Sequence, residues 1–356
     1  MRPQDFGSRT LPRRLHAREY SGQHAMDFLA RMWPALAEAD PAATAYQDAA
    51  WLLAWARHLP ARCEPLVLAA VDDGDRPLAA LALARELTPD GRTCITALSS
   101  PASEQIRPVG ENTDAVSVLL DHLPALGDEV LLTDLPDSCL LARQAHSRWG
   151  VPDAQTLYAT VCLPVDLTAL SRSTRREHTR RRRAVQALGE RVGYHRTRTG
   201  TQLLAAFDTL EDLHHRRNAL RPPDAHAPDL TLPWRQVLND CAGLAFIATL
   251  TLDGQAVAAQ LCLHHRDRAY SLITAMDPAH RELSPGHALL QMLCEDLTSE
   301  GYTALDLGRT TAHDGQRNYK AAHGATWTTT RTYTAPAALR PPVRQPAGLA
   351  DAGSRR

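Results

Sequence analysis

The sequence predicts an α/β fold made of two similar units in tandem, each a mostly antiparallel mixed sheet flanked by helices. Both halves alternate apolar runs with turns, and Asp-Gly marks the first turn of each half, at Asp73-Gly74 and Asp253-Gly254. Asp-Gly tolerates the positive φ angles of a two-residue hairpin turn, so each sheet is expected to begin as a meander. Gly127 in the first half and Gly301 in the second are separated by nearly the same number of residues as the two Asp-Gly turns. An offset that is kept across several landmarks indicates a repeat.

Each unit is expected to contain a three-stranded meander, a helix and a further strand. In the second unit these elements are expected at 244–251, 255–264, 269–276, 286–299 and 303–307. In the first unit their counterparts are expected at 66–71, 77–86, 92–98, 112–123 and 129–133. Helix 286–299 carries its apolar residues on one face, as a helix packed on a sheet requires.

The segment between the two meanders predicts a strand near 158–164 and two helices. The first helix, 174–188, is basic and begins with the capping-box pattern of Thr174 and Glu177. The second helix, near 201–219, is amphipathic. The expected organisation is therefore a tail over 1–20, a first unit over 21–157, a second unit over 158–335 and a tail over 336–356.

Bulk composition excludes several classes of protein. A chain of 356 residues favours two domains, and a net charge of −1 argues against a generic polyanion binder. The seven cysteines form no Cys-x-x-Cys pair, and the adjacent histidine pairs lack the spacing of a metal-binding helix face, so no metal site is expected. No apolar run is long enough for a membrane span, and the basic start lacks a signal-peptide core. These features predict a cytoplasmic protein.

A short turn after the third strand of the second meander is the strongest candidate site. The segment 277–290 joins the strand ending at Met276 to the next helix through small residues. A helix that begins directly after a strand presents unpaired backbone N–H groups at the positive end of its dipole. This geometry favours a pyrophosphate or another anion.

This turn resembles the pyrophosphate loop of the GNAT acyltransferase superfamily, whose pattern is Arg/Gln-x-x-Gly-x-Gly/Ala. Arg281 and Gly286 match the pattern, and Ser284 replaces its first glycine. The doubled arrangement, the basic helix and the late Tyr-Lys-x-x-x-Gly further resemble the FemAB-like, tandem-GNAT group, including BioF2-like acetyltransferase domains. The second unit matches well. The first matches in outline only, because its turn at 109–114 carries two acids, and we expect a degenerate copy that shapes an acceptor cleft.

The resemblance implies an N-acyltransferase in which an amine attacks the donor directly. The donor is either an acyl-CoA such as acetyl-CoA, as is common in the superfamily, or an aminoacyl-tRNA, as in FemAB-like members. The acceptor is expected to be a small-molecule or peptide amine. The implied donor-binding residues are Arg281, Ser284, Gly286, His287 and Ala288. Pro285 removes one N–H from this cradle, so the two donors stay open alternatives.

The resemblance also assigns catalytic roles. A backbone N–H near 273–275 is implied to polarise the acyl carbonyl, and Tyr319 to protonate the leaving group. Lys320 is the sole lysine of an arginine-rich chain, and we expect it to steady an oxyanion or a phosphate. The general base stays open among Asp306, Glu282 and His323.

Arginines provide the candidate substrate or phosphate contacts, because their guanidinium groups suit phosphate backbones. The residues expected in this role are Arg176, Arg180, Arg217 and Arg309. Arginines crowd the basic helix, which makes tRNA a candidate partner and leaves a noncatalytic polyanion-binding or nucleic-acid-binding protein as the alternative function. A structural partner in a biosynthetic assembly is a third class. The sequence leaves the acceptor, the acyl group and the oligomeric state open.

Overall fold

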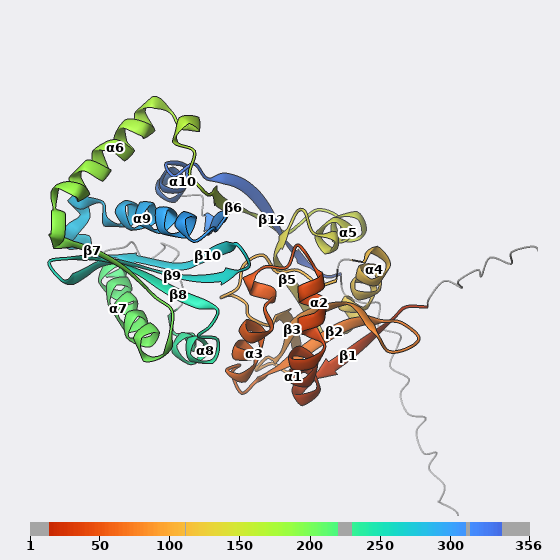
Figure 1. Cartoon of the computed structure of the whole chain (residues 1–356). Coiled ribbons are helices and arrows are strands. Elements are labelled where there is room, and N and C mark those ends of the chain that lie inside the picture. The colour runs from red at the N-terminus through yellow and green to blue at the C-terminus, as the bar shows by residue number, and fades with distance from the viewer. Residues whose placement is uncertain (1–13, 111, 220–229, 311–313, 337–356) are drawn as a thin grey trace, which may run out of the picture.

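A computed structural model describes residues 14–110, 112–219, 230–310 and 314–336. Its centre is one continuous twelve-stranded sheet in the order β1-β2-β3-β4-β5-β12-β6-β11-β10-β9-β8-β7 (Figure 1). The strands are β1 (His16–Ser21), β2 (Cys63–Val71), β3 (Pro77–Leu87), β4 (Thr93–Ala97), β5 (Glu129–Pro136), β6 (Ala154–Cys162), β7 (Val192–Thr197), β8 (Ala245–Leu252), β9 (Gln255–His265), β10 (Arg268–Met276), β11 (Ala304–Thr310) and β12 (Thr326–Thr334).

Helices flank both faces of this sheet. They are α1 (Gly22–Arg31), α2 (Trp33–Ala39), α3 (Ala49–Arg57), α4 (Thr113–His122), α5 (Leu140–Trp149), α6 (Arg172–Ala187), α7 (Gly200–Asn218), α8 (Trp234–Asp240), α9 (Pro285–Ser299) and α10 (Asp314–Ala321). Short 3₁₀ helices include η1 (Ala45–Gln47) and η5 (Pro278–Leu283). None of the helices in these described segments combines the length and apolarity needed to cross a membrane.

The strands alternate their side chains between two layers of core, as the two-residue period of a strand requires. In β2, Val67 joins a cluster with residues of α1, α3, α7 and α8, whereas Leu68 faces α4 and α5. In β8, Ile247 joins the first cluster, whereas Phe246 faces α9. The first cluster therefore runs without a break from the first unit into the second.

The two units exchange their last strands. β12, at the end of the chain, pairs antiparallel with β5 of the first unit. β6, which follows α5, pairs antiparallel with β11 of the second unit. β6 and β12 also pair with each other, from Thr160 against Thr326 to Ala154 against Thr332. Neither sheet is complete without a strand from the other unit.

The expected α/β fold of two similar units in tandem is confirmed, and the differences are local. Residues 16–20, expected in the N-terminal tail, belong to β1 because they pair with β2. The basic helix begins at Arg172, and its capping residue is Ser171, whose hydroxyl accepts from the Thr174 amide at 3.1 Å. The expected unit boundary at 157/158 falls inside β6. Residues 1–13 and 337–356 lie outside the described residues.

Candidate active site

The turn after β10 has the local geometry of an anion site at a helix start. β10 ends at Met276, η5 follows, and α9 begins at Pro285. Ser284 holds a left-handed backbone at φ 50° and ψ 53°, a conformation that a residue with a Cβ seldom adopts. At Gly286 an added Cβ would meet only the Met276 sulfur at 3.5 Å, so the free protein has space for a larger residue there.

The amides of this turn are partly used within the protein. The His287 and Ala288 amides both donate to the Ser284 carbonyl, at 3.0 and 3.2 Å, and the Ser284 amide donates to Arg281 O at 3.0 Å. Within the described part of the chain the Gly286 amide has no hydrogen-bond partner. The expected cradle is therefore reduced to the Gly286 N–H, with the exposed Arg281 side chain preceding it in the loop.

The gap beside this turn arises because β10 and β11 separate. They pair in parallel only from Arg268–Tyr270 against Ala304–Asp306. β10 continues to Met276 and β11 to Thr310, and a bulge at 271–273 redirects β10. Beyond the last pair, each strand has one edge that its former neighbour no longer covers.

Groups from elsewhere occupy both of these edges. On β10, Arg217 of α7 donates to the Thr274 carbonyl at 2.9 Å, which places this expected substrate-binding arginine beside the segment near 273–275. On β11, the Arg309 amide donates to Glu104 Oε2 at 3.0 Å. Glu104 comes from the first unit, in the loop between β4 and α4.

Tyr319 and Lys320 point in different directions from α10. The Tyr319 hydroxyl donates to the Gly286 carbonyl at 3.0 Å, and its ring lies 4.6 Å from the ring of His287. Burial raises the Tyr319 pKa well above its usual range, so the phenol holds its proton at neutral pH. The structure thus brings Tyr319, His287 and Gly286 together at the first turn of α9.

Lys320 is buried against β11. Its Nζ donates to the Gly308 and Arg309 carbonyls at 2.8 and 2.6 Å, and to Thr310 Oγ1 at 3.0 Å. Burial lowers its pKa to about 8. These bonds satisfy backbone carbonyls along β11. The expected contact of Lys320 with an oxyanion or a phosphate stays a prediction.

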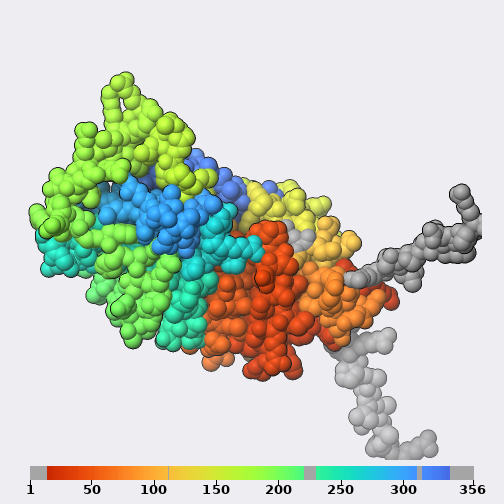
Figure 2. All heavy atoms as spheres, in the orientation of Figure 1, coloured from red at the N-terminus to blue at the C-terminus, as the bar shows by residue number. Residues whose placement is uncertain are grey.

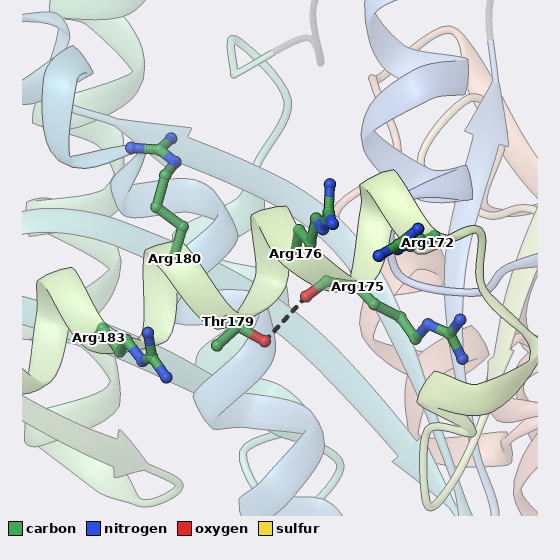
Figure 3. Close-up of a pocket in the computed structure, with 6 residues that line it drawn as sticks. All are labelled: Arg172, Arg175, Arg176, Thr179, Arg180 and Arg183. Atoms are coloured by element: carbon green, nitrogen blue, oxygen red, sulfur yellow. Dashed lines mark hydrogen bonds between the residues drawn. The ribbon is translucent and has the colours of Figure 1, made fainter.

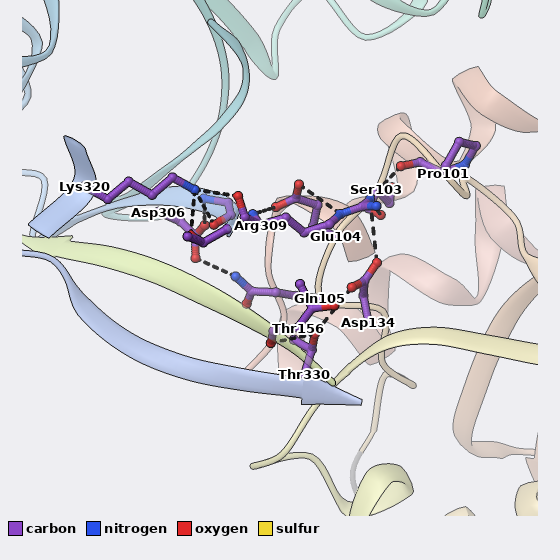
Figure 4. A network of polar contacts seen from close by, with 12 residues as sticks. Pro101, Ser103, Glu104, Gln105, Asp134, Thr156, Asp306, Arg309, Lys320 and Thr330 are labelled. Carbon is purple, nitrogen blue, oxygen red and sulfur yellow. Dashed lines mark hydrogen bonds and ion pairs between the residues drawn. The ribbon is translucent and has the colours of Figure 1, made fainter. Parts of the chain in front are cut away.

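Asp306 lies in a buried network that joins the two units (Figure 4). Its carboxylate accepts from Gln105 Nε2 at 2.5 Å, Thr160 Oγ1 at 3.2 Å and the Gly308 amide at 2.7 Å. Burial raises its pKa. Three hydrogen-bond donors therefore surround the carboxylate that was one of the candidate bases.

Arg309 is the centre of the same network. Its Nε donates to Glu104 Oε1 at 3.2 Å, and its Nη2 donates to Pro101 O at 2.7 Å and lies 3.6 Å from Asp134 Oδ2. We call Glu104, Asp134, Asp306, Arg309 and Lys320 the junction cluster. Sequence reasoning found three of its members but missed Glu104 and Asp134, because their contacts join residues far apart in the chain.

Three histidines form a second cluster that the sequence pattern did not reveal. His287 Nδ1 and His323 Nε2 lie 2.9 Å apart, and the His178 ring lies 5.0 Å from the His323 ring. His178 also bonds the Ala322 carbonyl. This histidine cluster, His178, His287 and His323, fastens α6 to α9 and α10. His323, another candidate base, is thus buried and in contact with His287.

α6 protrudes at one end of the molecule (Figure 2). Its outer side carries what we call the arginine face, formed by Arg172, Arg175, Arg176, Arg180 and Arg183 with Thr179 among them (Figure 3). Arg180 pairs with Glu177. For the other four, the described residues supply no carboxylate partner. Arg176 and Arg180 lie on this outer face, whereas Arg217 and Arg309 lie in the body of the molecule.

Comparisons with known proteins agree with this geometry. Residues 172–321 match the model of the acetyltransferase (GNAT) domain family, a range that runs from the first residue of α6 to the last of α10. No curated protein sequence matches the chain.

Solved structures with low sequence identity share the fold. A structure of FemX is similar with a TM-score of 0.61 and 13% identity, covering 85% of this chain and 95% of FemX. The C-terminal domain (DUF2156) of a putative lysylphosphatidylglycerol synthetase from Agrobacterium fabrum has a TM-score of 0.56 and 13% identity, covering 88% and 93%. L-PGS from Bacillus licheniformis has a TM-score of 0.50 and 13% identity, covering 74% and 82%.

Proposed function

We propose that this protein transfers an acyl group from a phosphate-bearing donor to an amine, because residues 172–321 match the acetyltransferase (GNAT) domain family and the chain is similar in fold to FemX. The observation that carries the proposal is the coincidence of two features inside the matched domain. The start of α9 offers the Gly286 amide, and beside it β10 and β11 separate. An anion at the helix start would place the rest of the donor along this gap.

The free groups of this turn are enough to bind one phosphate group, but not enough to surround a pyrophosphate with several backbone amides. Gly286 supplies an N–H and no side chain, and Arg281 supplies a nearby positive charge. Pro285 has no N–H, and the next two amides are used by Ser284. Acyl-CoA and aminoacyl-tRNA both carry phosphate groups and an activated acyl carbonyl, which are joined through the pantetheine arm in acyl-CoA and through the terminal ribose in aminoacyl-tRNA, and either can supply the acyl group.

Tyr319 is our candidate for the group that protonates the leaving group. Its phenol remains protonated at neutral pH because burial raises its pKa, and its oxygen lies 3.0 Å from the carbonyl of Gly286. We assign this phenol the donation of a proton to the departing thiolate or ribose oxygen, for which its hydroxyl must leave the Gly286 carbonyl. The amides near 273–275, on the β10 edge that Arg217 reaches, are our candidates for polarising the acyl carbonyl.

The test compares both donors with the same protein. The full chain is incubated with labelled acetyl-CoA in one reaction and with charged tRNA in another, each with a panel of primary amines. We expect label to move from one donor to an amine. Absence of transfer and of donor hydrolysis in both reactions would reject the proposal.

A variant of the turn tests the donor site itself. Gly286→Val is expected to weaken donor binding at least about tenfold, since a branched side chain would stand where the phosphate approaches. The matched control is Gly243→Val, at a surface glycine where an added Cβ meets nothing within 4 Å. Equal donor affinity in wild type and Gly286→Val would remove the loop from the site.

The arginine face supports a second candidate function, the binding of a polyanion such as tRNA. Four of its arginines lack a carboxylate partner among the described residues, so their charge is available to phosphates. Replacing Arg176 and Arg183 by alanine is expected to lower RNA affinity and to flatten its dependence on salt. Arg31→Ala, an exposed arginine of α1, serves as the control. Tight, salt-dependent binding without any acyl transfer would favour this function over catalysis.

A further inference from the structure

The first unit contributes a carboxylate to the gap in the second. β11 pairs with β6 at Arg309, and the Arg309 amide instead donates to Glu104, so this amide faces the edge that β10 has left. Glu104 Oε2 lies so close that a Cβ on Gly308, whose φ is +70°, would meet it at 2.6 Å. Glycine at 308 therefore makes room for the carboxylate of another unit.

The loop that carries Glu104 is fixed in place. Arg309 holds it through the Pro101 and Ser103 carbonyls, at 2.7 and 3.3 Å. Gln105, the next residue, donates to Asp306 at 2.5 Å. The position of the carboxylate is thus set by contacts on both sides of it, as a residue that receives a substrate requires.

The junction cluster has one more acid than it has bases. Glu104, Asp134 and Asp306 face Arg309 and Lys320; Asp134, Asp306 and Lys320 are buried, and the Glu104 and Arg309 side chains are 13% and 26% exposed. A buried negative charge without a partner is costly and is relieved by a proton or a cation. In the free protein Glu104 relieves this charge by binding a proton, because burial and the neighbouring Asp306 and Asp134 raise its pKa to about 7.

Two buried phenol groups whose pKa responds to this carboxylate lack hydrogen-bond partners among the described residues. Tyr46 and Tyr158 are 1% and 0% exposed, and within the described residues their hydroxyls have no hydrogen-bond partner. Burial raises the pKa of both phenols, and the negative charge of Glu104 raises it further. Buried hydroxyls without partners are rare and indicate a ligand or water that completes them.

From these contacts we infer that Glu104 binds the acceptor, and that the acceptor is a primary amine that arrives as a cation, with its ammonium group against the Glu104 carboxylate. The cation supplies the charge that the junction cluster lacks and brings N–H donors to the phenol oxygens. This inference rests on the proposed acyl transfer and adds the charge of the acceptor and the residue that receives it.

The proton balance gives Glu104 a second task. The ammonium passes one proton to the carboxylate, and the amine nitrogen then forms a bond to the acyl carbon. The bond from that carbon to the thiolate or ribose oxygen of the donor breaks, the leaving group takes the proton of Tyr319, and the second nitrogen proton replaces it on the phenol. Glu104 releases its proton to solvent after the amide product departs. Its raised pKa brings its basicity closer to that of an amine.

Every element packed around Glu104 carries a group that sets its charge. Asp134 stands on β5, Asp306 and Arg309 on β11 and Lys320 on α10. Tyr46 stands on η1 and Tyr158 on β6. Because the two bases remain paired within the cluster, the added cation acts chiefly on Glu104.

The test follows the carboxyl group by infrared difference spectroscopy, with n-butylamine as the probe and n-butanol as its uncharged counterpart. At neutral pH we expect n-butylamine to remove the protonated carboxyl band of the full-length protein and n-butanol to leave it. We expect Glu104→Gln to lack this response and to bind n-butylamine about tenfold more weakly, whereas Glu64→Gln, on the surface of β2, behaves as wild type.

Three outcomes would overturn the inference: no band change with n-butylamine, an equal change with n-butanol, or an unchanged response in Glu104→Gln. A wild-type protein without a band change overturns the inference even if Glu104→Gln does not fold. The readout needs no donor, so it separates the two proposals. A band response without acyl transfer would reject the proposed function alone, and transfer without a band response would reject the role of Glu104 alone.

Discussion

At the scale of single residues, the sole lysine shows what rarity in a sequence does and does not indicate. We expect its scarcity to mark a place where arginine would not serve, because a compact ammonium fits between closely spaced acceptors. Scarcity does not say what those acceptors are. In the structure they are the Gly308 and Arg309 carbonyls and the Thr310 hydroxyl.

Lys320→Ala is therefore expected to lower the free energy of unfolding by about 2–4 kcal/mol, since it leaves buried carbonyls without a donor. A residue that only touched a substrate would leave stability unchanged. Urea unfolding measures the difference, with Arg317→Ala on the exposed side of α10 as the control. A stability equal to wild type, together with lost transfer, would restore the catalytic role.

The pKa of Glu104 sets a dependence of stability on pH. Its folded pKa of about 7 lies above its usual value of 4.5, so between these values the folded state binds more protons than the unfolded state. Stability is then expected to fall as pH rises from 4.5 to 7, by up to roughly 3 kcal/mol from this group. Urea unfolding at pH 5.5 and 7.5 checks this, and Glu104→Gln should show a smaller fall. An equal fall in both proteins would assign the effect to other groups.

At the scale of elements, the histidine cluster explains how a helix with so little apolar surface is held. α6 buries only His178. Burial lowers the pKa of His287 to about 4 and that of His323 well below its usual range, so both are neutral at physiological pH. Neutral imidazoles can pack against one another, whereas imidazolium ions at His287 and His323 would repel each other and Arg181.

Acidification is therefore expected to loosen α6. Between pH 6.5 and 4 the histidine binds a proton in the unfolded state but not at the folded position of His287. The stability that this group contributes is therefore present at neutral pH and is lost as pH falls. Hydrogen exchange of the α6 amides at pH 7 and 5 measures the loosening, and α4 provides the internal control. Equal protection of α6 at both pH values would show that the cluster does not hold the helix.

Elements with strong local patterns were predictable, and those that depend on distant partners were not. The helix at Pro285–Ser299 and the hairpin between β8 and β9 follow from apolar periodicity and Asp253-Gly254. β12 was missed because its sequence, TWTTTRTYT, has no apolar run, although Thr, Trp and Tyr favour strands, and its place between β5 and β6 depends on partners far away in the chain. The Glu104–Arg309 contact was hidden for the same reason, since 205 residues separate its partners.

At the scale of the whole molecule, the exchange of β6 and β12 makes the two units one folding body. The shared apolar cluster adds to this, with the Trp55 ring of α3 lying 5.4 Å from the Trp234 ring of α8. The junction cluster lies where the exchanged strands meet, so the proposed acceptor site exists only when both units are folded together.

Removal of β12 should consequently unfold both units and not only the second. A chain ending at Gly324 leaves β5 and β6 with open edges and takes Tyr333 out of the core of α4 and α5. A chain ending at Pro336 keeps β12 and is the matched control. We expect the control to unfold in one thermal transition like the full chain, measured by circular dichroism, and the shorter chain to show no cooperative transition. A shorter chain in which protease-resistant residues 16–136 persist would show instead that the first unit folds alone, and the exchange of strands would then be a late docking step rather than the basis of the fold.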